Sequence, residues 1–169
     1  MKSTRQLTIS AMSLALGIIL PQAFHMVPNA GSIFLPMHMP VIFGAYFVSP
    51  IYAFIVGILC PLVSHIVFQM PTTAMLGQMV VELGAYGLCA SLLNRYLNIR
   101  KDIIKTYAVL VISMLVGRMA YGIMNCLFFK AGEYSLSIWL SSAFVTCLPG
   151  IMIQIILIPI LVVNARRIY

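Results

Sequence analysis

The sequence predicts an all-α integral membrane protein with six transmembrane helices and both termini in the cytoplasm. Three observations support this fold class. Of the 169 residues, 62% are hydrophobic and only 8% are charged, too few charges to cover the surface of a water-soluble domain. Apolar runs long enough to cross a bilayer recur along the whole chain. Lysine and arginine gather in three short stretches, which decides how the helices are oriented.

Six apolar segments are expected to cross the membrane, and together they form a single domain over residues 1–169. All but the second are close to the ~20 residues that span a bilayer core. The second segment is too short to cross without support from its neighbours, and Pro50 marks a tight break after it. In chain order, the segments are residues 7–25, 37–48, 50–68, 72–94, 104–128 and 138–163.

Basic residues place the termini and the central loop on the cytoplasmic side. The net charge of +7 therefore orients the protein in the bilayer, and we expect no nucleic acid partner. The connections at about 25–36, 69–72 and 129–137 then face outward. The first of them contains two prolines and a glycine, so we expect an irregular loop there. The basic residues that decide this orientation are Lys2, Arg5, Arg95, Arg100, Lys101, Lys105, Arg166 and Arg167.

Two opposite charges lie inside the predicted spans. Arg118 is about 14 residues into the fifth segment, or roughly 20 Å from its inner end. Glu82 is about 10 residues into the fourth segment, which runs the other way, or roughly 15 Å from the outer end. The two side chains are therefore expected at similar depth. A lipid-exposed charge costs ~2.5–3.5 kcal/mol or more, so both should face the interior of the helix bundle.

Further polar side chains share the faces of these two helices. Gln78 lies one turn before Glu82, and Tyr121 and Asn125 follow Arg118 by one and two turns. Together they have more hydrogen-bonding capacity than one ion pair requires. We therefore expect a polar pocket between the fourth and fifth segments.

Two residues from other segments are assigned to the same pocket. Gln154 contributes an amide from the sixth segment. His38, in "LPMHMP" at residues 35–40, is expected either to donate a hydrogen bond at the mouth of the pocket or to cap the second helix. Imidazole and thioether groups could bind Cu(I), but the chain contains 12 methionines. Their proximity to His38 is better explained by abundance, and we expect neither a metal nor a cofactor.

Arg118 and Glu82 admit three arrangements. In the first, they form a buried ion pair that holds two helices together. In the second, Arg118 binds the carboxylate or phosphate of a ligand. In the third, Glu82 orients Arg118 and the ligand completes the arrangement. The additional polar residues favour a ligand pocket over an ion pair alone.

Other features concern partners and chemistry. Ala11 and Ala15 are four residues apart on one face of the first segment, and such pairs of small residues let a second helix approach closely in lipid. That second helix belongs either to the same chain or to another protein. The sequence contains no GxxxxGK[ST], GxSxG or HExxH motif, so we do not expect an enzyme.

Several stretches of the chain are similar to one family of membrane proteins. They are "LPMHMPVIFGAYFVSPIYAFIVGILCPLVS", "VVELGAYGL", "VGRMAYGI" and "LPGIMIQIILIPILV". With the Ala11 and Ala15 pair, they resemble the substrate-binding S components of energy-coupling factor (ECF) vitamin transporters. The resemblance covers nearly the whole chain and is greatest to a branch that includes proposed pantothenate and pyridoxine carriers.

This resemblance implies a multi-pass protein of the bacterial plasma membrane that captures a micronutrient near the outer face. It also implies two kinds of partner, a membrane coupling protein called the T component and two cytoplasmic ATPases. The resemblance further implies that the protein topples in the membrane and so carries its ligand inward. Ala11 and Ala15 match the surface on which the family docks the T component. Arg118 favours an anionic ligand, and the carboxylate of pantothenate fits.

Two other classes of function remain open from the sequence. The chain could be a stand-alone secondary transporter or a small channel, with proton coupling through Glu82 and Arg118. At 169 residues, such a protein would need a dimer to form a path. A membrane enzyme acting on a lipid is a third alternative, with less support from the residues.

Overall fold

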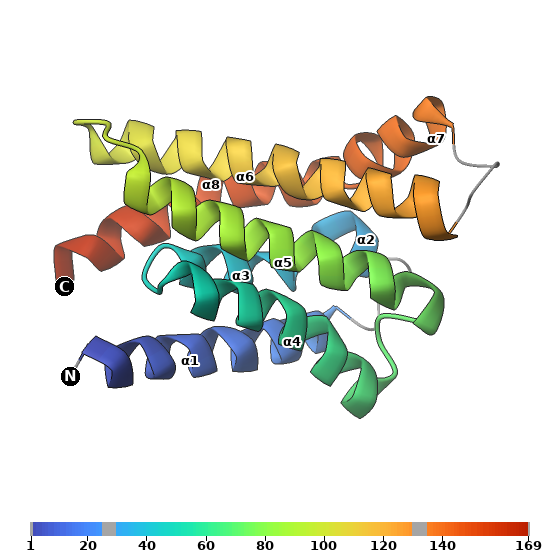
Figure 1. Ribbon diagram of the computed structural model, residues 1–169, viewed down its shortest axis with the longest axis horizontal. Coiled ribbons are helices and arrows are strands. Elements are labelled where there is room, and N and C mark those ends of the chain that lie inside the picture. Colours follow the sequence, from blue (N-terminus) through green and yellow to red (C-terminus); the bar gives the residue numbers. More distant parts are fainter. Residues whose placement is uncertain (1, 25–29, 130–134, 169) are drawn as a thin grey trace.

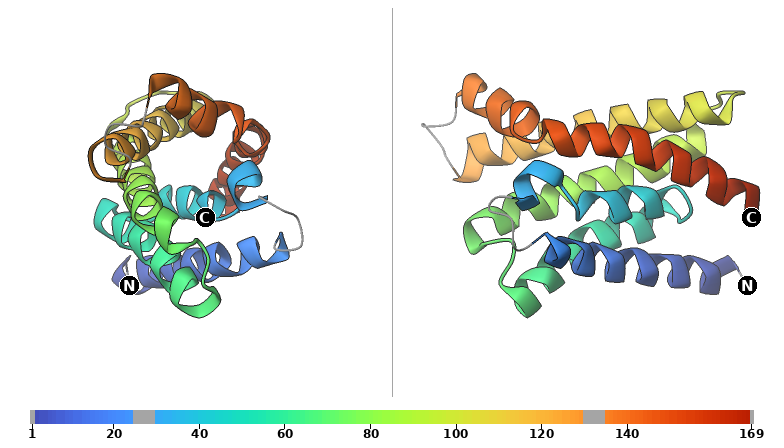
Figure 2. Two further views of the ribbon diagram at one scale, coloured as in Figure 1. Left: turned by 90° about the vertical axis from the view of Figure 1, so that its right-hand side faces the viewer. Right: turned by 180° about the vertical axis from the view of Figure 1, so that it is seen from behind.

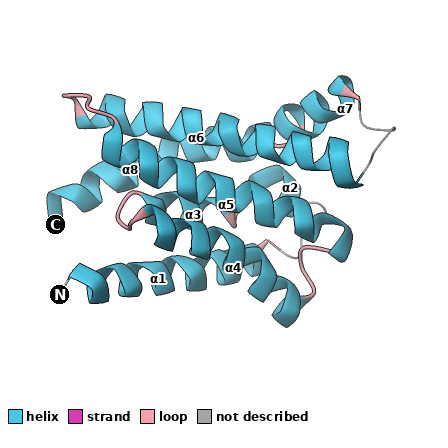
Figure 3. Cartoon of the chain, viewed as in Figure 1, coloured by secondary structure: helices cyan, strands magenta, loops and turns pink. Residues whose placement is uncertain are grey.

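The computed structural model describes residues 2–24, 30–129 and 135–168, and all regular structure in these ranges is helical (Figures 1 and 3). This confirms the all-α fold class. The long helices lie side by side along the longest axis of the molecule. The helices are α1 (Lys2–Ala23), α2 (Ala30–Phe34), α3 (His38–Ala45), α4 (Pro50–Phe68), α5 (Thr73–Tyr96), α6 (Asp102–Met124), η1 (Asn125–Phe129), α7 (Leu136–Leu140), η2 (Ser141–Val145) and α8 (Leu148–Ile168), where η marks a π-helical turn.

Among the described residues, five helices are long and apolar enough to span a membrane. They correspond to the first, third, fourth, fifth and sixth predicted segments, with bounds of Thr4–Ala23, Pro50–Phe68, Thr73–Tyr96, Asp102–Leu127 and Leu148–Arg167. The sixth segment begins later than predicted, because residues 138–147 belong to α7, η2 and a turn that precedes α8. Pro149 lacks an N–H donor and is tolerated in the first turn of the new helix.

The second predicted segment is a shorter apolar unit, Gly31–Ala45, formed by α2 and α3. The expectation of an irregular loop over residues 25–36 was wrong for residues 30–34, which form helix α2. Residues 25–29 lie outside the described part of the chain. Leu35, with φ of 50°, turns the chain between the two helices. Figure 2 shows α2 beside the beginning of α8, against which it packs. Tertiary packing thus stabilises a helix that its own sequence does not favour.

Helices α4 and α5 cross at very short range because glycine lies on both sides of the contact. A β-carbon on Gly57 would overlap the carbonyl oxygen of Leu83 and approach the α-carbon of Gly84 to 2.9 Å. A β-carbon on Gly87 would overlap the carbonyl oxygen of Ala53. Small residues allow this backbone contact in lipid, where van der Waals packing drives helix association. We call this contact the α4–α5 seam; it fixes the rotation of α5 and therefore the direction of Glu82.

Both termini and the α5–α6 connection lie at one end of the molecule, which we call the basic end (Figure 1). A hydrogen-bond network links four helices there. Tyr46 donates to the carbonyl oxygen of Thr106 at 2.8 Å, and Asn94 donates to that of Tyr46 at 2.8 Å. Arg166 donates to Asn94 at 2.5 Å and to Asp102 at 3.1 Å. These bonds hold the ends of α5, α6 and α8 around the end of α3.

Helix α1 has one inward face and one outward face. Ser10, Ser13 and Gly17 are buried against the rest of the bundle, and α1 packs on α3 and α4. Ala11 and Ala15 are exposed on the other side of the helix. Both alanines are therefore largely uncovered by the described part of the chain.

Candidate functional site

Helices α5 and α6 bring the two intramembrane charges into contact. The Nη1 atom of Arg118 lies 2.8 Å from Oε1 of Glu82. The residues are 3% and 2% exposed, so the pair is shielded from both lipid and water. A buried pair of this kind is costly to break, because removing one partner leaves an uncompensated charge.

His38, the first residue of α3, is the third member of this group. Its Nε2 atom lies 3.7 Å from Oε2 of Glu82, which is too long for a hydrogen bond. Its ring meets the ring of Tyr86 edge-on, with centroids 5.3 Å apart and an interplanar angle of 81°. The residue is 2% exposed. The two roles expected for His38 were a hydrogen bond at the mouth of the pocket and a cap on the second helix. Neither ring nitrogen has a hydrogen-bond partner among the described residues, and Met37, not His38, is the N-cap residue of α3.

Only one of the three nitrogens of the Arg118 guanidinium takes part in these contacts. Nη1 faces Glu82, whereas Nε and Nη2 have no hydrogen-bond partner among the described residues. The thiol of Cys147 lies beside the guanidinium, but sulfur is a weak acceptor. Nε and Nη2 form the edge of an arginine that binds carboxylate or phosphate with two parallel hydrogen bonds. We refer to these two atoms as the open edge of Arg118.

Other buried polar atoms also have spare hydrogen-bonding capacity within the described ranges. Both ring nitrogens of His38, Oδ1 of Asn125 and Nε2 of Gln154 have no hydrogen-bond partner there. Asn125 and Gln154 are each 1% exposed. Buried polar groups are nearly always hydrogen-bonded, so a concentration of unsatisfied ones requires an explanation. A polar ligand or bound water would satisfy them.

Two of the predicted site residues, Gln78 and Tyr121, have surroundings that differ from those expected. The amide of Gln78 donates to the carbonyl oxygen of Ala74, one turn earlier in α5, at 2.9 Å, so the amide nitrogen serves its own helix. Tyr121 is partly exposed, although it follows Arg118 by only three residues. Glu82 is therefore the centre of the site, with Arg118 on one carboxylate oxygen and His38 close to the other. Asn125 and Gln154 are also buried in the bundle interior.

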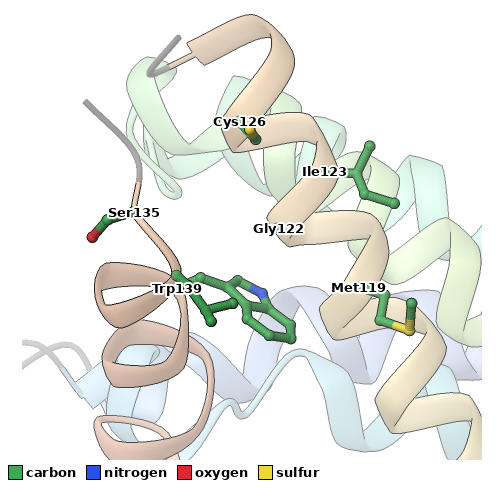
Figure 4. Close-up of a pocket in the computed structure, with 7 residues that line it drawn as sticks. Met119, Gly122, Ile123, Cys126, Ser135 and Trp139 are labelled. Atoms are coloured by element: carbon green, nitrogen blue, oxygen red, sulfur yellow. The ribbon is translucent and has the colours of Figure 1, made fainter. Parts of the chain in front are cut away.

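A groove of about 280 Å³ lies beside α6 (Figure 4), and Arg118 is not among the residues that line it. Its lining is almost entirely apolar and includes Met119 and Ile123, which are largely exposed on the outside of α6. The side chain of Arg118 is buried in the bundle, whereas Gly122, one turn later, borders the groove. The remaining lining residues are Gly122, Cys126, Ser135, Leu136 and Trp139.

Three residues around the site are not among the predicted site residues. Tyr86 follows Glu82 by four residues, and the sequence places it on the same polar helix face as Gln78 and Glu82, but it was not assigned to the pocket. Cys147 is a lone cysteine in an apolar segment, and such a residue carries no signal of a site. Trp139, the only tryptophan of the chain, donates from Nε1 to the carbonyl oxygen of Arg118 at 3.1 Å. No spacing rule connects residues of two different helices in this way.

Comparison with known proteins places the chain in a family. No curated protein and no solved structure matches it. The family model described as "ECF transporter, substrate-specific component" matches residues 5–162, which is most of the chain. With several apolar helices of spanning length, the family makes this a multi-pass membrane protein. The chain belongs to the family of substrate-specific components of ECF transporters, the subunits that capture the substrate.

Proposed function

We propose that the chain captures an anionic vitamin, with pantothenate as the first candidate, and delivers it inward with a T component and two cytoplasmic ATPases. The protein would lie in the bacterial plasma membrane with its basic end in the cytoplasm. The observation that carries the proposal is the open edge of Arg118, a buried pair of donors for which the described residues offer no hydrogen bond.

The arrangement supports the alternative in which Glu82 orients Arg118 and a ligand completes the site. Glu82 contacts only one side of the guanidinium, through Nη1, and so orients it without using the edge that recognises carboxylates. An intramembrane arginine with two idle donors is costly, and this cost is recovered when a ligand carboxylate binds there. Asn125 and Gln154 supply an acceptor and a donor for the polar remainder of such a ligand.

The experiment is a binding measurement on the purified full chain in lipid nanodiscs with radiolabelled pantothenate. We expect saturable binding that unlabelled pantothenate displaces. Native mass spectrometry of protein purified from rich medium identifies any small molecule that co-purifies. A co-purified cation, or the absence of pantothenate binding, would contradict the proposed ligand. Uptake that persists without ATPases and collapses with an uncoupler would instead support a stand-alone transporter.

The face of α1 that points away from the bundle leads to a prediction about partners. Ala11 and Ala15 are exposed and four residues apart, which suits close contact with a helix of the T component. Replacing both with tryptophan should abolish co-purification with the T component, because two large rings prevent close approach. Binding of pantothenate by the isolated chain should not change, since neither alanine contacts the buried charges.

A matched control uses another exposed pair with the same spacing. Val111 and Leu115 lie on α6 and are 42% and 47% exposed. Tryptophan at both positions adds the same bulk to a different face of the bundle. We expect the control to retain the T component, measured by pull-down from co-expressing cells. Equal loss in both variants would show that α1 has no special role in docking.

A further inference from the structure

The segment from Trp139 to Cys147 contacts Arg118 at both its backbone and its side chain. The indole N–H of Trp139 donates to the carbonyl oxygen of Arg118 at 3.1 Å. At the other end of the segment, the thiol of Cys147 lies beside the Arg118 guanidinium. One stretch of chain, which belongs to neither α5 nor α6, thus adjoins Arg118 at two points: it donates a hydrogen bond to the backbone and lies beside the guanidinium.

Hydrogen bonds within the segment connect these two contacts. The hydroxyl of Ser142 donates to the carbonyl oxygen of Trp139 at 3.2 Å. The thiol of Cys147 donates to the carbonyl oxygen of Ser142 at 3.2 Å. The rings of Trp139 and Phe144 also meet edge-on at 5.6 Å. The segment therefore forms a chain of hydrogen bonds that begins at the backbone of Arg118 and ends at the thiol beside its guanidinium. We call it the α7–η2 clasp (residues 139–147).

The contact of Trp139 with α6 depends on Gly122. A β-carbon at that position would lie 2.5 Å from Nε1 and 2.7 Å from Cδ1 of the indole. Figure 4 shows the Trp139 ring between α7 and α6, next to Gly122. Gly122 is one turn after Arg118, so the ring lies directly on the turn that bears the guanidinium. Any larger residue at this position would push the indole away from its acceptor.

We propose that Trp139 is a positioning residue that holds the α7–η2 clasp closed over Arg118 and so controls access to the open edge. The proposal rests on the function given above, in which that edge binds the ligand. Because Arg118 is 3% exposed and Cys147 is 4% exposed, a ligand reaches the guanidinium only after a covering segment moves. The clasp is the covering segment that is tied to the arginine itself.

The test measures access to Cys147 with N-ethylmaleimide, on full-length protein in nanodiscs with Cys60, Cys89 and Cys126 replaced by alanine. Trp139→Phe keeps an aromatic ring and removes the N–H donor. We expect the labelling rate of Cys147 to rise about fivefold to tenfold, the effect of one neutral hydrogen bond on an opening equilibrium. Gly122→Ala should raise it similarly, and the double variant should not exceed either single variant, because both break the same contact.

Controls separate this role from a general loosening of the bundle. Leu136→Ala removes a groove residue of α7 that is not part of the clasp, and it should leave the labelling rate unchanged. A second background that retains only Cys60, which is fully buried, should show no faster labelling with Trp139→Phe. The proposal is overturned if Cys147 labelling stays within twofold of the parent, if the two substitutions are additive, or if Cys60 labelling rises equally.

Labelling in the presence of pantothenate tests the proposed function separately from the role of Trp139. Saturating pantothenate should slow the labelling of Cys147 in the parent protein, because the ligand occupies the open edge beside the thiol. If pantothenate gives no protection, the ligand assignment fails. The rates without ligand still decide whether Trp139 holds the clasp.

Discussion

Replacing Arg118 by lysine is expected to lower the affinity for pantothenate about 100-fold while the protein remains folded. Lysine keeps a positive charge opposite Glu82, so the buried carboxylate is still neutralised. It cannot reproduce the two parallel donors of the open edge, which are the atoms proposed to bind the ligand carboxylate. Loss of a charge-assisted hydrogen bond contributes about 1.5–3 kcal/mol, which corresponds to roughly 10- to 150-fold in affinity. Equilibrium binding of radiolabelled pantothenate measures the effect.

Two comparison variants separate ligand binding from the buried ion pair. Arg118→Ala leaves Glu82 as an uncompensated buried charge and should destabilise the protein by about 3–5 kcal/mol. Glu82→Gln removes the negative charge beside the ligand and should retain or increase the affinity for an anion. If Arg118→Lys binds pantothenate as tightly as the parent, and only stability changes across the series, the pair serves to join α5 and α6 and nothing more.

Adding one methyl group at Gly57 is expected to destabilise the bundle by about 3 kcal/mol. The β-carbon would overlap the carbonyl oxygen of Leu83 at the α4–α5 seam, and a backbone carbonyl within a helix cannot rotate away as a side chain can. Overpacking of this kind typically costs 1–3 kcal/mol and sometimes more. Because Glu82 precedes Leu83 directly, separating the helices also moves the charged pair. Reversible unfolding in mixed detergent micelles gives the change in stability of Gly57→Ala.

The chain contains matched glycines against which this result can be judged. A β-carbon on Gly31, in α2, would meet no atom within 4 Å, so Gly31→Ala should be neutral or slightly stabilising. A β-carbon on Gly84 would approach the side chains of Ile58 and Phe54 to 3.3 Å, which can adjust, so an intermediate loss is expected. Equal stability of all three alanine variants would show that the seam is not as closely packed as described.

The apolar periodicity of the chain was sufficient to predict its long helices. Segment 50–68 matches α4 in both bounds, and 72–94 is within two residues of α5 at each end. Long apolar runs leave little choice in a bilayer, since a spanning segment must satisfy its own backbone hydrogen bonds. The depth of Arg118 and Glu82 could be estimated for the same reason, because a helix advances a constant distance per residue.

The short elements could not be predicted in this way. Helix α2 forms in a stretch that contains turn residues, because packing against α8 stabilises it. The break before α8 divides an apolar run that looked continuous. A short helix is marginal on its own, so its existence depends on neighbours that come from distant parts of the chain.

The sequence by itself determined the class of protein, its long helices and the presence of two opposite charges at similar depth within them. Only the tertiary structure decided which atoms of those charges are used: Nη1 of Arg118 for Glu82, with the open edge left for a ligand. It also decided that His38 lies beside Glu82 and that Trp139 contacts the backbone of Arg118. The physical reason is that composition and period follow from the solvent that surrounds a helix, whereas atomic contacts depend on how each helix is rotated. That rotation is fixed by close contacts such as the α4–α5 seam, between residues far apart in the chain.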